Sequence, residues 1–295
     1  MDIDNVGKGA LPDLPDDRDY MVDKDILGAA TVDWSKEFRL PEPPPEDQGS
    51  SDSCVAQSWS YYHWQLHGKN YSRRDLFCRI AINYGAYIRD GGKELVGSGQ
   101  ATRDEVSDPN PETPQNMRDA SGTKPEYRSD DQELNYFRLS HEDINGVAWG
   151  IQNYKGVVFG VNGSNPGWQD MKNPRPPLRG ETLWGHALYA MGCHTHDGQK
   201  CIIAKSSWSK YVSEHHIKEN YYLTGNAFSV WTLIPKEQSM TNSLIVKNGD
   251  ELGIYDPATS EDGLITLMRN RGMDVPLTPD GKLDFSKITI TKTLS

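Results

Sequence analysis

Apolar residues recur at helical spacing in one stretch of the first half of the chain. These positions are Val55, Ala56, Trp59, Tyr62 and Leu66. They lie near the i, i+3, i+4, i+7 positions of one helical face, which predicts a helix over 55–67. Ser and Asp residues crowd the turn before it, where helix caps belong. A second helix is expected to start at Ser72, with Asp75 three residues later in a variant of the capping box.

The second half of the chain changes to short apolar runs separated by turn residues. The runs expected to form strands are 157–161, 186–192, 201–206 and 221–223. Between the two halves, the segment 91–127 is rich in Gly, Asp and Pro, and we expect loops around one short helix near 115–120. Helices followed by strands predict an α+β protein.

Segments of different character flank this central part, which we place at residues 32–236. Residues 1–31 are polar and rich in Asp and Pro, so they are expected to form an extended arm. In residues 237–295, two apolar runs flank Asn248-Gly249 and predict a β-hairpin. A short helix is expected over 263–270. We interpret 237–295 as an appendage that packs on the main domain or on a partner.

The charge and the apolar content exclude two classes of partner. Thirty-one Lys and Arg against 42 Asp and Glu give a net charge of −11, which argues against binding to nucleic acid. No apolar run approaches the ~18 residues of a membrane span. The N-terminal residues lack the basic and apolar regions of a signal peptide. We therefore expect a protein that is cytoplasmic or associated with a virus particle, and not one that binds a membrane.

Four cysteines are too few and too scattered for a disulfide framework. Cys193 and Cys201 flank a hairpin signal with Asp197-Gly198 at its tip, and a three-residue loop would place the two thiols opposite each other. With His194 and His196 nearby, a zinc site is conceivable there. Two half-buried thiols beside a polar turn are the favoured interpretation, because the spacing matches no known zinc knuckle.

Cys54 has the features of a nucleophile. It would lie on the first turn of the predicted helix, where the helix dipole favours a negative charge and lowers the pKa of a thiol. Gln48, six residues upstream, lies on the loop that leads into this helix. Its side-chain amide could donate a hydrogen bond to an oxyanion that forms beside the sulfur.

Five short segments follow one another in a recognisable order. They are Leu11-Pro12-Asp13-Leu14-Pro15-Asp16-Asp17-Arg18-Asp19-Tyr20, Val32-Asp33-Trp34, Asp47-Gln48-Gly49 with Ser53-Cys54, Gly185-His186-Ala187-Leu188 and Ala204-Lys205-Ser206-Ser207-Trp208. In this order they resemble the papain-like (C1) cysteine peptidases, and in particular their bacterial and phage-type branch. The resemblance covers roughly residues 10–236 and rests on the set as a whole.

The resemblance implies a papain-like two-lobe fold, with a helical lobe, a β-barrel-like lobe and the site between them. It further implies that Cys54 is the nucleophile, His186 the base, Ser206 the residue that orients the base, and Gln48 the oxyanion donor. Trp208 would shield the histidine bond from water. The implied activity is that of an endopeptidase that acts on protein or peptide substrates without a metal or other cofactor.

Three positions depart from the family pattern, and they leave an alternative function open. Ser206 stands where the family usually has Asn, Val55 where it has an aromatic residue, and Ser51 where it has a cysteine. A serine hydroxyl is shorter than an asparagine amide but can still accept the bond from the imidazole. The alternative is a weakly active or inactive papain-fold protein that serves a larger assembly, such as a phage particle, through its C-terminal appendage.

The arm can dock in two ways with opposite consequences. Across the cleft it would inhibit, and on the back of the domain it would act as a structural strap. We expect the strap, with Leu14 and Tyr20 buried against the domain and Arg18 paired to a carboxylate.

Overall fold

The computed structural model describes residues 8–16, 19, 32–128, 131–163, 166–170, 173–177, 184–209 and 212–234. It also describes the backbone of three short strands nearer the C-terminus. The chain forms two compact units, residues 1–234 and 235–295. Among the helices of the described residues, none has both the length and the apolar character needed to cross a bilayer.

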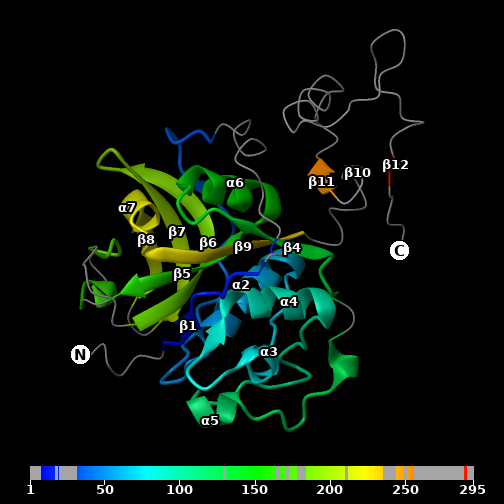
Figure 1. Ribbon diagram of the computed structural model, residues 1–295. Coiled ribbons are helices and arrows are strands. Elements are labelled where there is room, and N and C mark those ends of the chain that lie inside the picture. Colours follow the sequence, from blue (N-terminus) through cyan, green and yellow to red (C-terminus); the bar gives the residue numbers. More distant parts are fainter. Residues whose placement is uncertain are drawn as a thin grey trace. The chain divides into compact units, whose positions relative to one another are not determined.

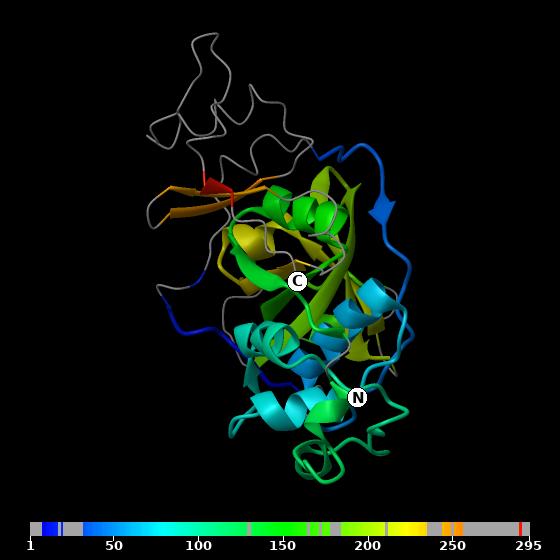
Figure 2. The ribbon, with the colours of Figure 1, turned by 90° about the vertical axis from the view of Figure 1, so that its right-hand side faces the viewer.

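Helices dominate the first half of the first unit. They are α2 (Cys54–His67), α3 (Arg73–Ile80), α4 (Ile88–Gly97) and α5 (Pro114–Met117). The predicted start of the second helix is confirmed, because the Ser72 hydroxyl caps α3 by accepting a hydrogen bond from the backbone N–H of Asp75. These helices gather below the sheet in both views, and α6 (Ile144–Tyr154) lies above it (Figures 1 and 2).

Helix α4 corrects the prediction of loops from residue 91 onwards. Its Gly91 and Gly92 suggested a turn, but they serve close packing instead. A Cβ atom at Gly91 would lie 2.1 Å from Cδ1 of Trp59, so only a glycine lets α4 approach this indole. The helix therefore depends on a tertiary contact that local sequence does not reveal.

A seven-stranded antiparallel sheet forms the second half of the unit. Its order is β4-β9-β5-β6-β7-β8, with β2 paired to β6. The strands are β2 (Phe38–Arg39), β4 (Asn135–Leu139), β5 (Val157–Gly163), β6 (Trp184–His196), β7 (Gln199–Trp208), β8 (Val212–Lys218) and β9 (Ala227–Ile234). Helices followed by strands confirm the predicted α+β class.

Two predictions within the sheet region are wrong. Residues 221–223 form part of a short helix, α7 (Glu219–Leu223), which turns Tyr221 and Tyr222 into the core. The predicted three-residue loop between β6 and β7 is instead a two-residue turn. Asp197 and Gly198 both adopt positive φ, and His196 pairs with Gln199. Cys201 is therefore opposite His194 rather than Cys193.

Helix α2 joins the helices to the sheet through an aromatic core. Trp59 stacks on Tyr62, and Tyr62 packs against Tyr189 of β6 with ring centroids 5.6 Å apart. The Tyr62 hydroxyl hydrogen-bonds Oγ1 of Thr232 on β9 at 2.7 Å. All these side chains are buried, so the helix that begins at Cys54 is fixed against the strand that carries His186.

The second unit contains a three-stranded antiparallel sheet. Its strands are β10 (Leu244–Asn248), β11 (Glu251–Tyr255) and β12 (Thr289–Ile290), with β10 in the centre. Strands β10 and β11 pair where the Asn248-Gly249 signal predicts a hairpin, with Asn248 opposite Glu251. The short helix expected over 263–270 lies outside the described residues.

Candidate functional site

Cys54 is the first residue of α2 and is fully buried. Ser53 occupies the N-cap position but its side chain makes no capping bond. Its hydroxyl instead lies 2.7 Å from that of Ser51 and accepts a hydrogen bond from Gln57. The sulfur thus lies at the end of the helix where free backbone N–H groups favour a negative charge.

The surroundings of the thiol nevertheless hold it in the neutral form. Burial raises the pKa of Cys54 to about 12, although backbone N–H groups of Ala187, Val55 and Ala10 lie at the sulfur and lower it in part. Ala187 directly follows His186. This contact therefore places β6, the strand that carries the candidate base His186, beside the thiol. Ala10 belongs to the N-terminal arm, so the arm also reaches the sulfur.

His186 is held by two neighbours on β7. Its Nε2 lies 3.2 Å from Oγ of Ser206, and its ring stacks on Trp208 with centroids 3.9 Å apart and an interplanar angle of 16°. Burial lowers the pKa of His186 well below its ordinary value, with smaller effects from His215 and Lys8. Its Nδ1 is buried without a hydrogen-bond partner among the described residues, so it remains available to a substrate or a thiol.

Gln48 is buried and fixed at both ends of its amide. Its Nε2 donates to the carbonyl oxygen of Ser51 at 2.7 Å, and its Oε1 accepts from the Ser207 hydroxyl. The backbone N–H of Gln48 donates to the Ser207 carbonyl at 2.9 Å. Because a carbonyl can only accept, the amide orientation is determined, and the second N–H of Nε2 has no acceptor among the described residues.

The arm contacts this site, whereas we expected it to dock on the back of the domain as a strap. The Gly9 N–H donates to the Gly185 carbonyl at 3.1 Å, and the Ala86 N–H donates to the Gly9 carbonyl at 2.9 Å. Strand β1 (Ala10–Leu11) pairs in parallel with β3 (Ala86–Tyr87), and Figure 1 shows it between the sheet and the helices. Gly185 precedes His186, so the arm binds both sides of the site.

Asp13 anchors the arm beyond the site. Its carboxylate accepts hydrogen bonds from Nε1 of Trp231 at 2.6 Å and from the backbone N–H of Arg89 at 3.0 Å. Its own N–H donates to Oγ of Ser229 at 2.8 Å. Leu14, expected to be buried, is 60% exposed because the polar contacts of Asp13 fix the chain instead. Arg18 and Tyr20 lie outside the described residues.

Cys193 and Cys201 of the β6–β7 hairpin do not lie together as the zinc site considered above would require. Because Cys201 pairs with His194, Cys193 points to the opposite face of the sheet. His194 instead hydrogen-bonds His216, with 2.8 Å between Nε2 and Nδ1.

One group of side chains was not anticipated from the sequence. His63 and His67 meet Glu133 beside the C-terminal half of α2. The i, i+4 spacing of the two histidines was the available signal, whereas nothing in the spacing pointed to Glu133.

Solved structures similar to this chain are cysteine proteases. Xylellain, a cysteine protease from Xylella fastidiosa, is 21% identical, with a TM-score of 0.64 over 78% of this chain and 97% of that one. Digestive procathepsin L2 from Tenebrio molitor larval midgut is 17% identical, with a TM-score of 0.62 over 79% of each chain. Bromelain from Ananas comosus, in complex with the E64 inhibitor, is 12% identical, with a TM-score of 0.56 over 70% of this chain and 100% of that one.

At the level of sequence, neither a protein-family model nor a curated protein matches the chain. The structural likeness covers 78% of this chain for xylellain and 79% for procathepsin L2. The chain therefore has the papain-like two-lobe fold found in these cysteine proteases.

Proposed function

We propose that the chain is a cysteine endopeptidase in which the Cys54 thiolate attacks a peptide carbonyl. The observation that supports this most strongly is that Cys54 lies beside the residue that follows His186, while Ser206 contacts the His186 imidazole. The amide next to His186 lies at the Cys54 sulfur, and the imidazole is bonded to Ser206 on its other side. The xylellain likeness favours the bacterial branch of the family.

The mechanism requires His186 to use its two nitrogens differently. When the Ser206 hydroxyl accepts the Nε2–H, the lone pair on Nδ1 can take the proton of the thiol. The helix dipole of α2 then stabilises the thiolate. The backbone N–H of Cys54 and the free N–H of Gln48 stabilise the oxyanion. His186 returns the proton to the leaving amine and then activates water to release the acyl group.

The arm makes the described state a covered form of this site. It lies on the sulfur and bonds to Gly185 as an added strand would, so a peptide substrate cannot occupy the same position. The burial of Cys54 and His186 in this covered form also keeps both groups neutral. Turnover therefore requires the arm to leave, after which water and substrate reach the thiol.

Alkylation of Cys54 tests this proposal directly. In the full chain the raised pKa keeps the thiol protonated at neutral pH, so iodoacetamide and the epoxide E-64 are expected to label it very slowly at pH 6–7. Once the arm is displaced, the thiolate is expected to form and labelling at the same pH to increase. Peptide mapping by mass spectrometry measures this at each cysteine. Equal, rapid labelling of Cys54 in both forms would contradict the covered site.

Ser206 provides a second test, based on orientation of the base. Ser206→Ala removes the partner of His186 Nε2 and is expected to lower turnover about 3- to 10-fold, the effect of one lost hydrogen bond. Ser206→Asn restores an acceptor and is expected to keep or raise turnover. The measurement is kcat across a pH series, with the arm displaced in every variant. A large loss in Ser206→Asn together with no loss in Ser206→Ala would show that Ser206 does not orient the base.

A further inference from the structure

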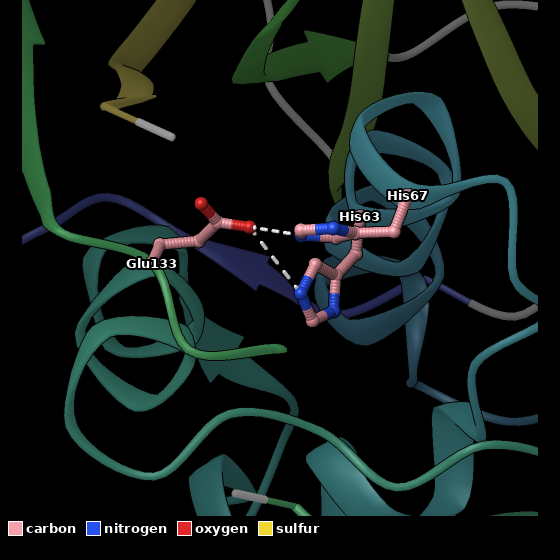
Figure 3. A group of neighbouring side chains, drawn as sticks. All are labelled: His63, His67 and Glu133. Carbon is pink, nitrogen blue, oxygen red and sulfur yellow. Dashed lines mark hydrogen bonds and ion pairs between the residues drawn. The ribbon is translucent and has the colours of Figure 1, made fainter. Parts of the chain in front are cut away.

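His63, His67 and Glu133 form a compact group away from the peptidase site (Figure 3). One ligand atom from each lies within 4.8 Å of the others. Oε1 of Glu133 is 2.7 Å from Nε2 of His67 and 3.4 Å from Nε2 of His63. The side chains of His63 and Glu133 are fully buried, and that of His67 is 16% exposed.

The helix and one adjoining segment bring these groups together. His63 and His67 are one turn apart on α2 and therefore share a face of the helix. Glu133 lies just before β4, where its backbone N–H donates to the carbonyl of Leu95 at 3.1 Å. Figure 3 shows both imidazole rings directed at the same oxygen of the Glu133 carboxylate.

Gln100 determines which nitrogen of His63 carries a proton. Nε2 of Gln100 donates to the carbonyl of Ser72 at 2.8 Å and to the Ser60 hydroxyl at 2.7 Å, which fixes the orientation of the amide. Its Oε1 then faces Nδ1 of His63 at 3.2 Å, so Nδ1 must be the N–H donor. A neutral His63 therefore presents the lone pair of its Nε2 to the group.

That lone pair faces only oxygen atoms. Nε2 of His63 lies 2.9 Å from the carbonyl oxygen of Asp131 as well as 3.4 Å from Glu133. The Nε2 lone pair, the Asp131 carbonyl oxygen and Oε1 of Glu133 repel one another unless a proton or a metal ion lies between them. In a metal-bound histidine, the ring nitrogen that does not bind the metal usually donates a hydrogen bond to an oxygen. Nδ1 of His63 does so to Oε1 of Gln100.

The second oxygen of Glu133 gives a separate geometric indication of a missing partner. This atom, Oε2, is buried with no hydrogen-bond partner in the described part of the chain. A buried carboxyl oxygen without a partner is costly unless a donor or a cation meets it.

We propose that His63 Nε2, His67 Nε2 and the Glu133 carboxylate bind one divalent transition-metal ion, with Zn²⁺ as the expected species. Two imidazole nitrogens and one carboxylate form a common ligand set for zinc. Asp131 would support the site from outside, since its Oδ1 is 3.9 Å from Nδ1 of His67 and its Oδ2 is held by Lys69 and Tyr71.

The ion would act on structure rather than on the peptidase reaction. His63 is nine residues along α2 from Cys54, or about 14 Å at 1.5 Å per residue. Binding would tie the C-terminal half of α2 to the segment that enters β4, and so fix the helix whose first residue is Cys54. The proposal does not depend on peptidase activity.

Metal titration of the full chain tests the site. After removal of metal by a chelator, Zn²⁺ is expected to bind at one equivalent per chain, as measured by elemental analysis after dialysis. Saturating Zn²⁺ is expected to raise the Tm by about 5 °C. Co²⁺ is expected to give the visible absorption of a low-symmetry nitrogen and oxygen site.

Variants of two ligands and two other histidines locate the binding. His67→Gln and Glu133→Gln are expected to weaken Zn²⁺ binding at least about 100-fold and to abolish the Tm shift. His141→Gln and His194→Gln, which remove histidines outside the group, are expected to change neither. His67→Cys keeps a ligand and is expected to add a thiolate-to-cobalt charge-transfer band, so it reports on the site even if the other variants fold poorly.

Two results would overturn the proposal. One is a wild-type chain that binds no Zn²⁺, in which case a proton on His63 supplies the positive charge. The other is binding that survives in His67→Gln and Glu133→Gln but is lost in His194→Gln, which would place the metal at the His194–His216 pair.

Discussion

Replacing Gly9 by valine is expected to raise peptidase activity about 30- to 150-fold. Gly9 has φ +147° where the arm crosses the site, and a Cβ atom there would lie 2.3 Å from the carbonyl oxygen of Asp52. The strain and the lost backbone bonds to Gly185 and Ala86 together cost about 2–3 kcal/mol of arm binding. At about 1.36 kcal/mol per tenfold, this cost gives the stated increase in uncovered protein.

The matched control is Leu14→Ala, which changes an exposed residue of the same arm. It is expected to leave activity unchanged. Asp13→Ala, which removes the acceptor for Trp231 and Arg89, is expected to act in the same direction as Gly9→Val. Initial rates on a peptide library and the Tm are measured for each variant. A lower Tm with no gain in activity would restore the structural strap as the role of the arm.

The covered site shows where local sequence is informative and where it is not. Helix α2 and the Ser72 cap of α3 follow from side chains within a few residues of one another, and both were predicted. The course of the arm depends on backbone bonds to residues about 75 and 175 positions away, at Ala86 and Gly185. The sequence suggested packing by Leu14 and Tyr20, whereas backbone bonds, Asp13 and the buried Ala10 hold the described part of the arm.

Two further features depended on contacts or turn geometry that spacing does not determine. The register of the β6–β7 hairpin differs by one residue from the predicted register, because Asp197 and Gly198 both adopt positive φ. This difference places the thiols of Cys193 and Cys201 on opposite faces of the sheet. The group of His63, His67 and Glu133 needed a partner 66 residues further along the chain. Helical spacing identifies the two histidines as neighbours but does not indicate which carboxylate meets them.

Replacing Cys54 by alanine in the Gly9→Val background is expected to lower kcat by about 10⁴-fold or more, leaving only the residual rate that substrate binding and the oxyanion donors supply. The change removes the only atom that can form the acyl intermediate in the proposed mechanism. Because Cys54 is buried in a close-packed core beside Val55 and Ala187, the smaller side chain is also expected to lower the Tm slightly. Hydrolysis of the peptide library gives the rate.

Cys78→Ala is the matched control, because it removes a half-buried thiol from α3 by the same chemical change. Its sulfur only donates to the Asp75 carbonyl at 3.3 Å, so activity should be retained. If Cys54→Ala keeps the turnover of its parent, the nucleophile is another group and the peptidase mechanism is wrong. E-64 could label Cys54 in the Gly9→Val parent although this parent cleaves no peptide. In that case the thiol is activated but does not turn over substrate. That result would favour the alternative of a papain-fold component in a larger assembly.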